Sequence, residues 1–218
     1  MSDSNYDPEL WYSPKYILAT ANYTIRNSPT REQKKKVEEA IPVSIACLAM
    51  FQQGKVPWWI QLVPESERAP DLRVMYYDKV DEMNRQNILD VEVVTLGNHS
   101  SGDDIAQFIL DTKLENPKKA YADEVAIVCY LNRKLTTVWR EVHEKLAAAG
   151  KKNNVYAVGK VRSDQNTYQF IQLNPTIDVL VQLEPDTKIP YQADILRGYR
   201  TGSKVIKPVE KHNPFDFV

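Results

Sequence analysis

Apolar residues recur along the chain with two periods, which predict the segments that form helices and those that form strands. Short loops rich in Pro, Glu, Asp and Asn separate the first three strand-like segments, as an antiparallel meander requires. The run VAIVCYL is apolar throughout and predicts a central strand buried on both faces. The predicted helices are 31–53, 101–114 and 135–149. The predicted strands are 56–63, 71–77, 89–96, 125–131, 155–161, 168–173 and 177–183.

Capping residues predict where these helices begin and end. Thr30 precedes a glutamine by three positions, and Ser101 precedes Asp104 by three, which is the spacing of a capping box. Pro42 is expected to kink or divide the first helix, because proline lacks the backbone N–H that the helix needs. Gly150 follows the last predicted helix, where a C-cap glycine belongs.

The order of the elements predicts the fold class. It runs helix, three-strand meander, helix, buried strand, helix and further strands. This order favours an α/β fold in which helices flank a mixed central β-sheet. We expect the core domain to span residues 30–185. Residues 1–29 have no periodicity and are expected to form an irregular arm, and residues 186–218 a basic, partly irregular C-terminal extension.

Composition and charge narrow the classes of function. Lys and Arg number 28 and Asp and Glu 29, so the net charge of -1 gives no global attraction to nucleic acid or membranes. The chain has only seven glycines and no glycine-rich phosphate motif. Cys47 and Cys129 lie in apolar runs, which predicts buried thiols rather than a disulfide or a zinc site. The polar N-terminus and the lack of a membrane-length apolar run predict a cytoplasmic protein without membrane contact.

Charged residues cover part of the first predicted helix. Lys34, Lys35 and Lys36 form a run, and Glu38 and Glu39 follow it closely. We expect this run to face solvent, because that is the ordinary role of clustered charges on a helix.

Two carboxylates occupy strand patterns, where an acid is unusual. Asp71 begins the strand in APDLRVMYY, and Glu92 lies in the middle of LDVEVVTL. An acidic side chain in an apolar strand is unfavourable unless it is paired, solvated or bound to a cation. The pattern leaves three explanations open. Asp71 can be a turn or strand-edge residue, Glu92 can face solvent or pair with Arg73, or both acids can bind one cation.

Five segments together resemble the restriction-endonuclease-like, or PD-(D/E)xK, nuclease superfamily. They are the first predicted helix, the phrases APDLRVMYY and LDVEVVTL, the helix DDIAQFILDTKL and the strand VAIVCYL. In that superfamily a Pro-Asp begins the second core strand, and a carboxylate followed by x-Lys lies on the third. Pro70, Asp71 and Glu92 match these positions, whereas Val94 stands in place of the lysine. The resemblance implies a restriction-endonuclease-like fold.

The resemblance also implies an activity. It implies hydrolysis of phosphodiester bonds in DNA with Mg²⁺, which Asp71 and Glu92 would hold. Some relatives use a further acid from the preceding helix, and Glu39 is the corresponding candidate here. The expected protein is therefore a Mg²⁺-dependent endonuclease that acts on DNA. A homodimer is also expected, since nucleases of this type that cut both strands often dimerise.

The missing lysine leaves two expectations open. In the superfamily this lysine positions or activates the attacking water, and Val94 cannot do so. Lys79, just after the Asp71 strand, and Lys113, on the helix after the Glu92 strand, are candidates to replace it. Gln107 on that helix could instead orient the water. Without a replacement, the chain is expected to be a non-catalytic nucleic-acid or protein interaction module that retains the nuclease-like fold.

Overall fold

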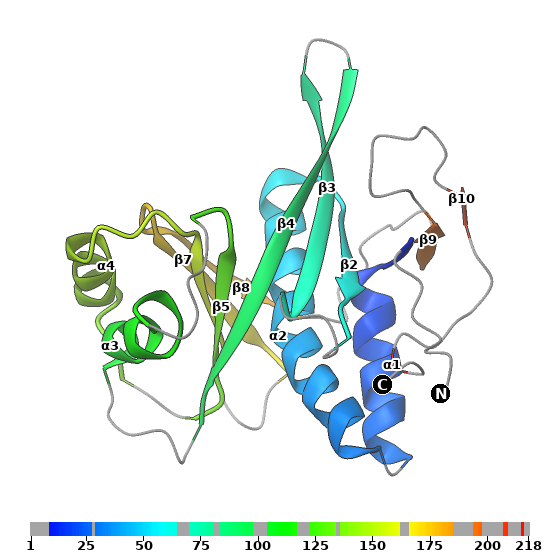
Figure 1. Cartoon of the computed structure of the whole chain (residues 1–218), viewed down its shortest axis with the longest axis horizontal. Coiled ribbons are helices and arrows are strands. Elements are labelled where there is room, and N and C mark those ends of the chain that lie inside the picture. Colours follow the sequence, from blue (N-terminus) through cyan, green and yellow to red (C-terminus); the bar gives the residue numbers. More distant parts are fainter. Residues whose placement is uncertain are drawn as a thin grey trace. The chain divides into compact units, whose positions relative to one another are not determined.

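The chain is a mixed α/β protein, as the sequence pattern predicts (Figure 1). Two compact units form it: residues 1–89 with 188–218 make unit 1, and residues 90–187 make unit 2. These boundaries differ from the arm, core and extension that the sequence suggested. The computed structural model describes residues 9–27, 29–64, 70–80, 83–97, 104–116, 123–133, 136–161, 166–184, 194–197, 207–208 and 215.

Unit 1 consists of two helices and a set of antiparallel strands. Its helices are α1 (Pro14–Arg26) and α2 (Arg31–Gly54). Its strands are β1 (Leu10–Tyr12), β2 (Trp58–Leu62), β3 (Leu72–Val80), the first part of β4 (Met83–Leu96), β9 (Ile195–Arg197) and β10 (Lys207–Pro208). The strand order is β10-β9-β1-β2-β3-β4, with antiparallel pairing from β10 to β3. The two helices pack side by side (Figure 1).

The N-terminal segment is more regular than the irregular arm expected over residues 1–29. Residues 10–26 form β1 and α1. Ser13 caps α1, since its hydroxyl accepts a hydrogen bond of 3.2 Å from the Tyr16 N–H. Pro14 occupies the first helical turn, where a missing N–H costs nothing. The prediction of an irregular arm was wrong, because Ile17, Ala21 and Thr24 recur at helical spacing and are buried, and α1 packs on α2.

Helix α2 begins where the sequence predicts, and Pro42 does not divide it. Thr30 and Gln33 form both hydrogen bonds of the capping box. The helix continues through Pro42 as far as Gly54, and Lys55 ends it in the left-handed conformation. Residues on both sides of Pro42 are buried, so packing outweighs the hydrogen bond that the proline removes.

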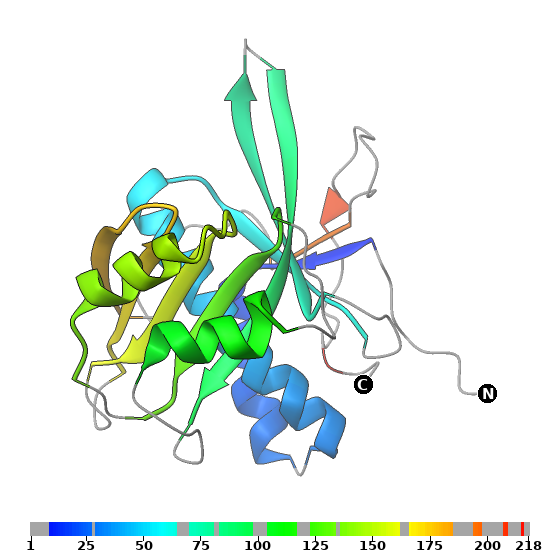
Figure 2. The same ribbon diagram turned by 60° about the vertical axis from the view of Figure 1, so that its left-hand side comes forward.

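Unit 2 is a mixed sheet with helices on one face. Its strands are the last part of β4, β5 (Ala126–Leu131), β6 (Val155–Lys160), β7 (Tyr168–Asn174) and β8 (Asp178–Leu183), in that order. Strands β4, β5 and β6 are parallel, and the pairs β6–β7 and β7–β8 are antiparallel. The helices are α3 (Ile105–Ile109), the π-helix η1 (Leu110–Leu114) and α4 (Trp139–Ala148). Figure 2 shows α3 and α4 side by side in front of these strands.

Strand β5 is the buried central strand that the sequence predicts. It pairs with β4 on one side and with β6 on the other. Its residues Ile127 and Cys129 point into the core beneath α3 and α4, together with Leu96, Leu146 and Val155. Both cysteines of the chain are buried free thiols, as expected, and burial raises the pKa of the Cys129 thiol to about 12. The burial of these apolar side chains therefore stabilises the packing of α3 and α4 on this face of the sheet.

The two helices of unit 2 begin later than predicted. Asp104, not Ser101, caps α3, because its carboxylate accepts from the Gln107 N–H at 3.1 Å. Ser101 itself lies outside the described residues. Helix α4 begins at Trp139, and Val138 precedes it without a side-chain cap.

Replacing Gly150 by Ala should destabilise the protein by about 1 kcal/mol. Gly150 follows α4 with a φ of 68°, and its N–H donates to the Ala147 carbonyl at 3.0 Å. An added Cβ would meet no atom within 4 Å, so the cost comes from the backbone conformation alone. Urea unfolding at equilibrium measures the difference.

Gly54→Ala is the matched control for Gly150→Ala. Gly54 is the last residue of α2, and an added Cβ there would also meet no atom within 4 Å. Its φ, however, is not positive. This variant should be neutral or slightly more stable, because Ala favours helix more than Gly does. Equal effects of the two substitutions would contradict a left-handed cap at Gly150.

Candidate functional site

Unit 2 brings together Glu92 and Lys113, two of the candidate residues. Lys113 Nζ lies 2.6 Å from Glu92 Oε2. Both residues are nearly inaccessible, with exposed fractions of 2 % for Glu92 and 7 % for Lys113. Side chains alternate along a strand, so Glu92 shares its face of β4 with Val94 and Leu96, which pack against α3. The pair therefore lies between the sheet and the helix that follows β4.

A π-helical turn carries the lysine to this position. Helix α3 continues directly into η1, and Lys113 is one of the five residues of that π-helix. The Glu115 N–H closes the turn by donating to the Leu110 carbonyl at 2.7 Å. A π-turn is rare and is frequently found at functional sites. The sequence gives no sign of it, because the apolar spacing of the segment is that of an ordinary helix.

The Glu92–Lys113 ion pair has a large effect on the stability of the fold. Removing two charges from water is costly, and close pairing with additional hydrogen bonds is what offsets the cost. The contact of 2.6 Å is short for a lysine–carboxylate hydrogen bond. Loss of either partner would leave the other charge buried.

Unit 1 contains a second group of charged residues, formed by Lys36, Glu39 and Asp71. Lys36 Nζ donates to Glu39 Oε2 at 2.8 Å and to the Asp71 backbone carbonyl at 3.2 Å. Lys36 is only 2 % exposed. The ammonium therefore connects α2 to Asp71, the residue just before β3, and Pro70 is buried as well.

The two acids of unit 1 influence each other. Burial raises the pKa of Glu39, and the nearby negative charge of Asp71 raises it further, while Lys36 and Lys35 lower it. Asp71 is therefore close enough to repel Glu39 electrostatically. A cation bound between two neighbouring carboxylates relieves their mutual repulsion.

The buried position of Lys36 corrects the expectation of a solvated charged face. Lys36 occupies the same face of α2 as Ala40, Ser44 and Cys47, all of which are buried. The i, i+4, i+8 spacing was present in the sequence and was the signal that could have identified it. Lys35 does face solvent, as expected, with its side chain 56 % exposed.

Other candidate residues have different neighbours. Gln107 is exposed, and its amide donates to Asp111 at 2.7 Å, so it takes no part in the Glu92–Lys113 pair. Arg73 is buried and donates to Gln61 at 3.2 Å. The side chain of Lys79 lies outside the described residues.

Glu39 and Asp71 are the acids of unit 1 that could hold a hard cation. Mg²⁺ binds through one or two carboxylates and keeps several waters, and Glu39 and Asp71 supply carboxylate oxygens. Within the described part of the chain, no group of three or more His, Cys, Asp or Glu side chains gathers around one point. A Mg²⁺ ion held here would therefore complete its octahedron with water or substrate oxygens.

No protein-family model, curated protein or solved structure matches the chain. The class that the fold defines is thus a mixed α/β protein with parallel central strands. Among the helices that the structure describes, none has the length and apolar character to span a bilayer.

Proposed function

We propose that the chain is a Mg²⁺-dependent, nuclease-like protein that hydrolyses phosphodiester bonds in DNA. One observation carries the proposal: the Lys113 ammonium lies 2.6 Å from the Glu92 carboxylate. In the PD-(D/E)xK superfamily the lysine lies two residues after the acid, on the same face of the strand. Val94 occupies that position here, and η1 supplies an ammonium to the same face instead.

The proposal gives each residue a role in the chemistry. Asp71 and Glu92 hold the Mg²⁺, with Glu39 as a further carboxylate. The ion stabilises charge on the attacking and leaving oxygens. Lys113 positions the attacking water through its ammonium protons.

A second function is favoured by the burial of the same pair. A water-positioning lysine must reach solvent or substrate, yet Lys113 and Glu92 are 7 % and 2 % exposed. In the alternative, the two form a structural ion pair, and the protein is a non-catalytic DNA-binding module with a nuclease-like fold. DNA cleavage and DNA binding therefore have to be measured separately.

Cleavage of supercoiled plasmid and of a short labelled duplex tests the nuclease proposal. The wild-type protein should cut in Mg²⁺ or Mn²⁺ and should be inactive in EDTA. Glu92→Gln and Asp71→Asn should abolish cleavage, and Lys113→Gln should slow it by at least about 100-fold, the usual contribution of a positioned proton-transfer group. Circular dichroism confirms that each variant is folded.

Lys145→Met is the matched control for the lysine. Lys145 also pairs with a carboxylate, Asp104, at 2.5 Å, but its side chain is 58 % exposed and belongs to α4. This variant should cleave at the wild-type rate. Fluorescence anisotropy of the duplex distinguishes the alternative, in which DNA binds without being cut in any metal. A protein that neither cuts nor binds DNA would contradict both functions.

A further inference from the structure

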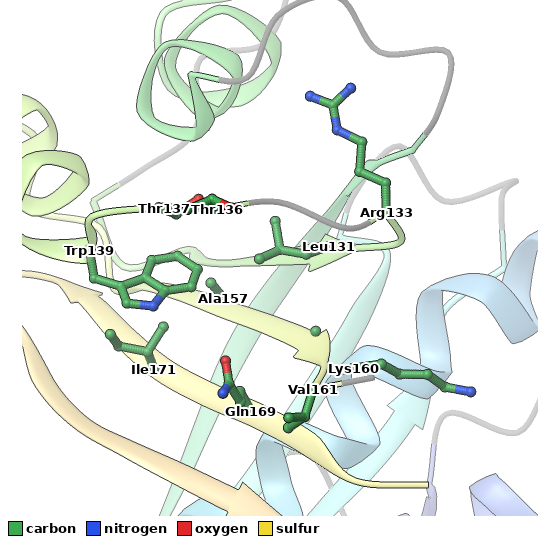
Figure 3. A pocket seen from close by; sticks show the side chains of 11 residues that line it. Leu131, Arg133, Thr136, Thr137, Trp139, Ala157, Lys160, Val161, Gln169 and Ile171 are labelled. Atoms are coloured by element: carbon green, nitrogen blue, oxygen red, sulfur yellow. The ribbon is translucent and has the colours of Figure 1, made fainter. Parts of the chain in front are cut away.

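Unit 2 contains a cavity of about 350 Å³ at the carboxyl ends of its parallel strands. Leu131 ends β5 at this point, Gly159 is near the end of β6, and Gln169 lies at the start of the antiparallel β7. The segment between β5 and α4 covers the other side with Thr136 and Thr137 (Figure 3). Ligands in α/β sheets commonly bind beyond the carboxyl ends of the strands.

The walls of the cavity combine a flat aromatic ring with hydrogen-bonding groups. Trp139, in the first turn of α4, closes one end, and Ile171 lies beside it (Figure 3). The Thr136 and Thr137 side chains lie across from the Gln169 amide (Figure 3). No hydrogen bond joins the Thr136, Thr137 or Gln169 side chains to another described residue, so these groups are available to a ligand. An aromatic side chain with a few converging polar groups is typical of small-molecule sites.

A positive charge lies at the end of the cavity away from the indole. Arg133 follows β5 and is a lining residue at the end opposite Trp139, and its guanidinium points away from Trp139 and Gln169 (Figure 3). Lys160 also contributes to the lining, with its ammonium 5.7 Å from the Tyr168 ring centroid. Aspartate and glutamate do not occur among the described lining residues. The arrangement therefore suits a ligand with an aromatic part at one end and an anionic group at the other.

We infer that this cavity binds a nucleotide. The base stacks on Trp139, as bases commonly do on aromatic side chains. The Gln169 amide, which has both a donor and an acceptor, hydrogen-bonds the edge of the base. The phosphate binds the Arg133 guanidinium and the threonine hydroxyls, which are suited to its oxygens. The cavity volume is within the usual range for small-ligand sites.

This site is separate from the candidate catalytic pair of the same unit. Glu92 pairs with Ile127, whereas the cavity begins at Leu131, four residues further along β5. At the rise of a β-strand, the two places are about 13 Å apart. Nucleotide binding therefore does not depend on the proposed nuclease activity, and neither result decides the other.

Calorimetric titration of the full chain with the four common nucleoside monophosphates tests the inference. At least one should bind, and its nucleoside and ribose 5-phosphate should each bind about 10-fold more weakly or worse, because each lacks one recognised group. A 5′-phosphorylated dinucleotide extends the test. If the dinucleotide binds as well as the mononucleotide, the ligand is the end of a nucleic-acid strand. If only the mononucleotide binds, the ligand is a free nucleotide.

Three variants locate the binding site. Trp139→Leu and Gln169→Leu should weaken binding about 10-fold, whereas Arg133→Gln should weaken binding of the nucleotide but not of the nucleoside. Arg140→Gln is the control, since Arg140 is an exposed arginine of α4 that pairs with Glu144. Thermal melts separate lost binding from lost folding for Trp139→Leu, because Trp139 also packs on the core.

Several outcomes would overturn the inference. They are failure of all four nucleotides to bind at millimolar concentration, equally tight binding of inorganic phosphate alone, and wild-type affinity in both Trp139→Leu and Arg133→Gln.

Discussion

Replacing Lys113 by Met should lower the free energy of unfolding by about 3–5 kcal/mol, the usual cost of removing one partner of a buried ion pair. The lysine and Glu92 are both buried and lie 2.6 Å apart. Met fills much of the same space but leaves the Glu92 carboxylate without its ammonium. Equilibrium urea unfolding measures this loss.

The double variant Glu92→Gln with Lys113→Met separates pairing from packing. Once neither residue is charged, most of the lost stability should return, since replacing both charges of a buried pair is often neutral. The control Lys145→Met removes an exposed ammonium from Asp104 and should cost about 0.2–1 kcal/mol. Similar small losses in Lys113→Met and Lys145→Met would contradict a buried pair.

Replacing Lys36 by Met should also cost about 3–5 kcal/mol at pH 8, because its buried ammonium binds Glu39 and the Asp71 carbonyl. The pKa of Glu39 is already raised in the folded state, first by burial and then by Asp71. Loss of Lys36 removes a group that lowers this pKa, so the pKa should rise further. An acid whose folded pKa exceeds its unfolded pKa loses stability as pH rises through that interval. The cost should therefore be greater at pH 8 than at pH 5.

Lys35→Met is the control for Lys36→Met. The two lysines are adjacent and both approach Glu39, but Lys35 Nζ lies 3.8 Å from Oε1 and its side chain is 56 % exposed. Its removal should cost less than about 1 kcal/mol, with little change between pH 5 and pH 8. A Lys36 variant that lost equal stability at both pH values would contradict the coupling of Lys36 to Glu39.

Some elements follow from local chemistry and could be predicted. The start of α2 depends on Thr30 and Gln33, which are three positions apart and satisfy each other's backbone groups. The C-terminal end of α4 depends on Gly150, because a left-handed residue is needed there. The buried strand β5 follows from an unbroken apolar run. In each case the interacting groups are neighbours in sequence.

Other elements depend on partners that are distant in sequence. The N-terminal helix α1 buries Pro14, Ile17, Ala21 and Thr24, which are spaced as on one helical face, and packs against α2. The π-turn η1 has the same apolar spacing as an α-helix, so no local pattern marks it. The charged run of α2 suggested solvent, but the position of Lys36 on the packed face decides its burial. Of the three, only η1 has no local signal, whereas α1 and Lys36 had helical spacing in the sequence, and packing decided which side of each helix is buried.

The candidate site, too, could be predicted only in part from the sequence. The sequence by itself drew attention to Asp71 and Glu92, placed Val94 where the nuclease resemblance expects a lysine, and offered Lys79, Lys113 and Gln107 as candidates to replace that lysine. Only the tertiary structure decided that Lys113 meets Glu92, 21 residues away, and that Gln107 faces solvent. The reason is physical: residue type and spacing fix what a side chain can do chemically, whereas burial and pairing depend on which helix face the packed sheet covers.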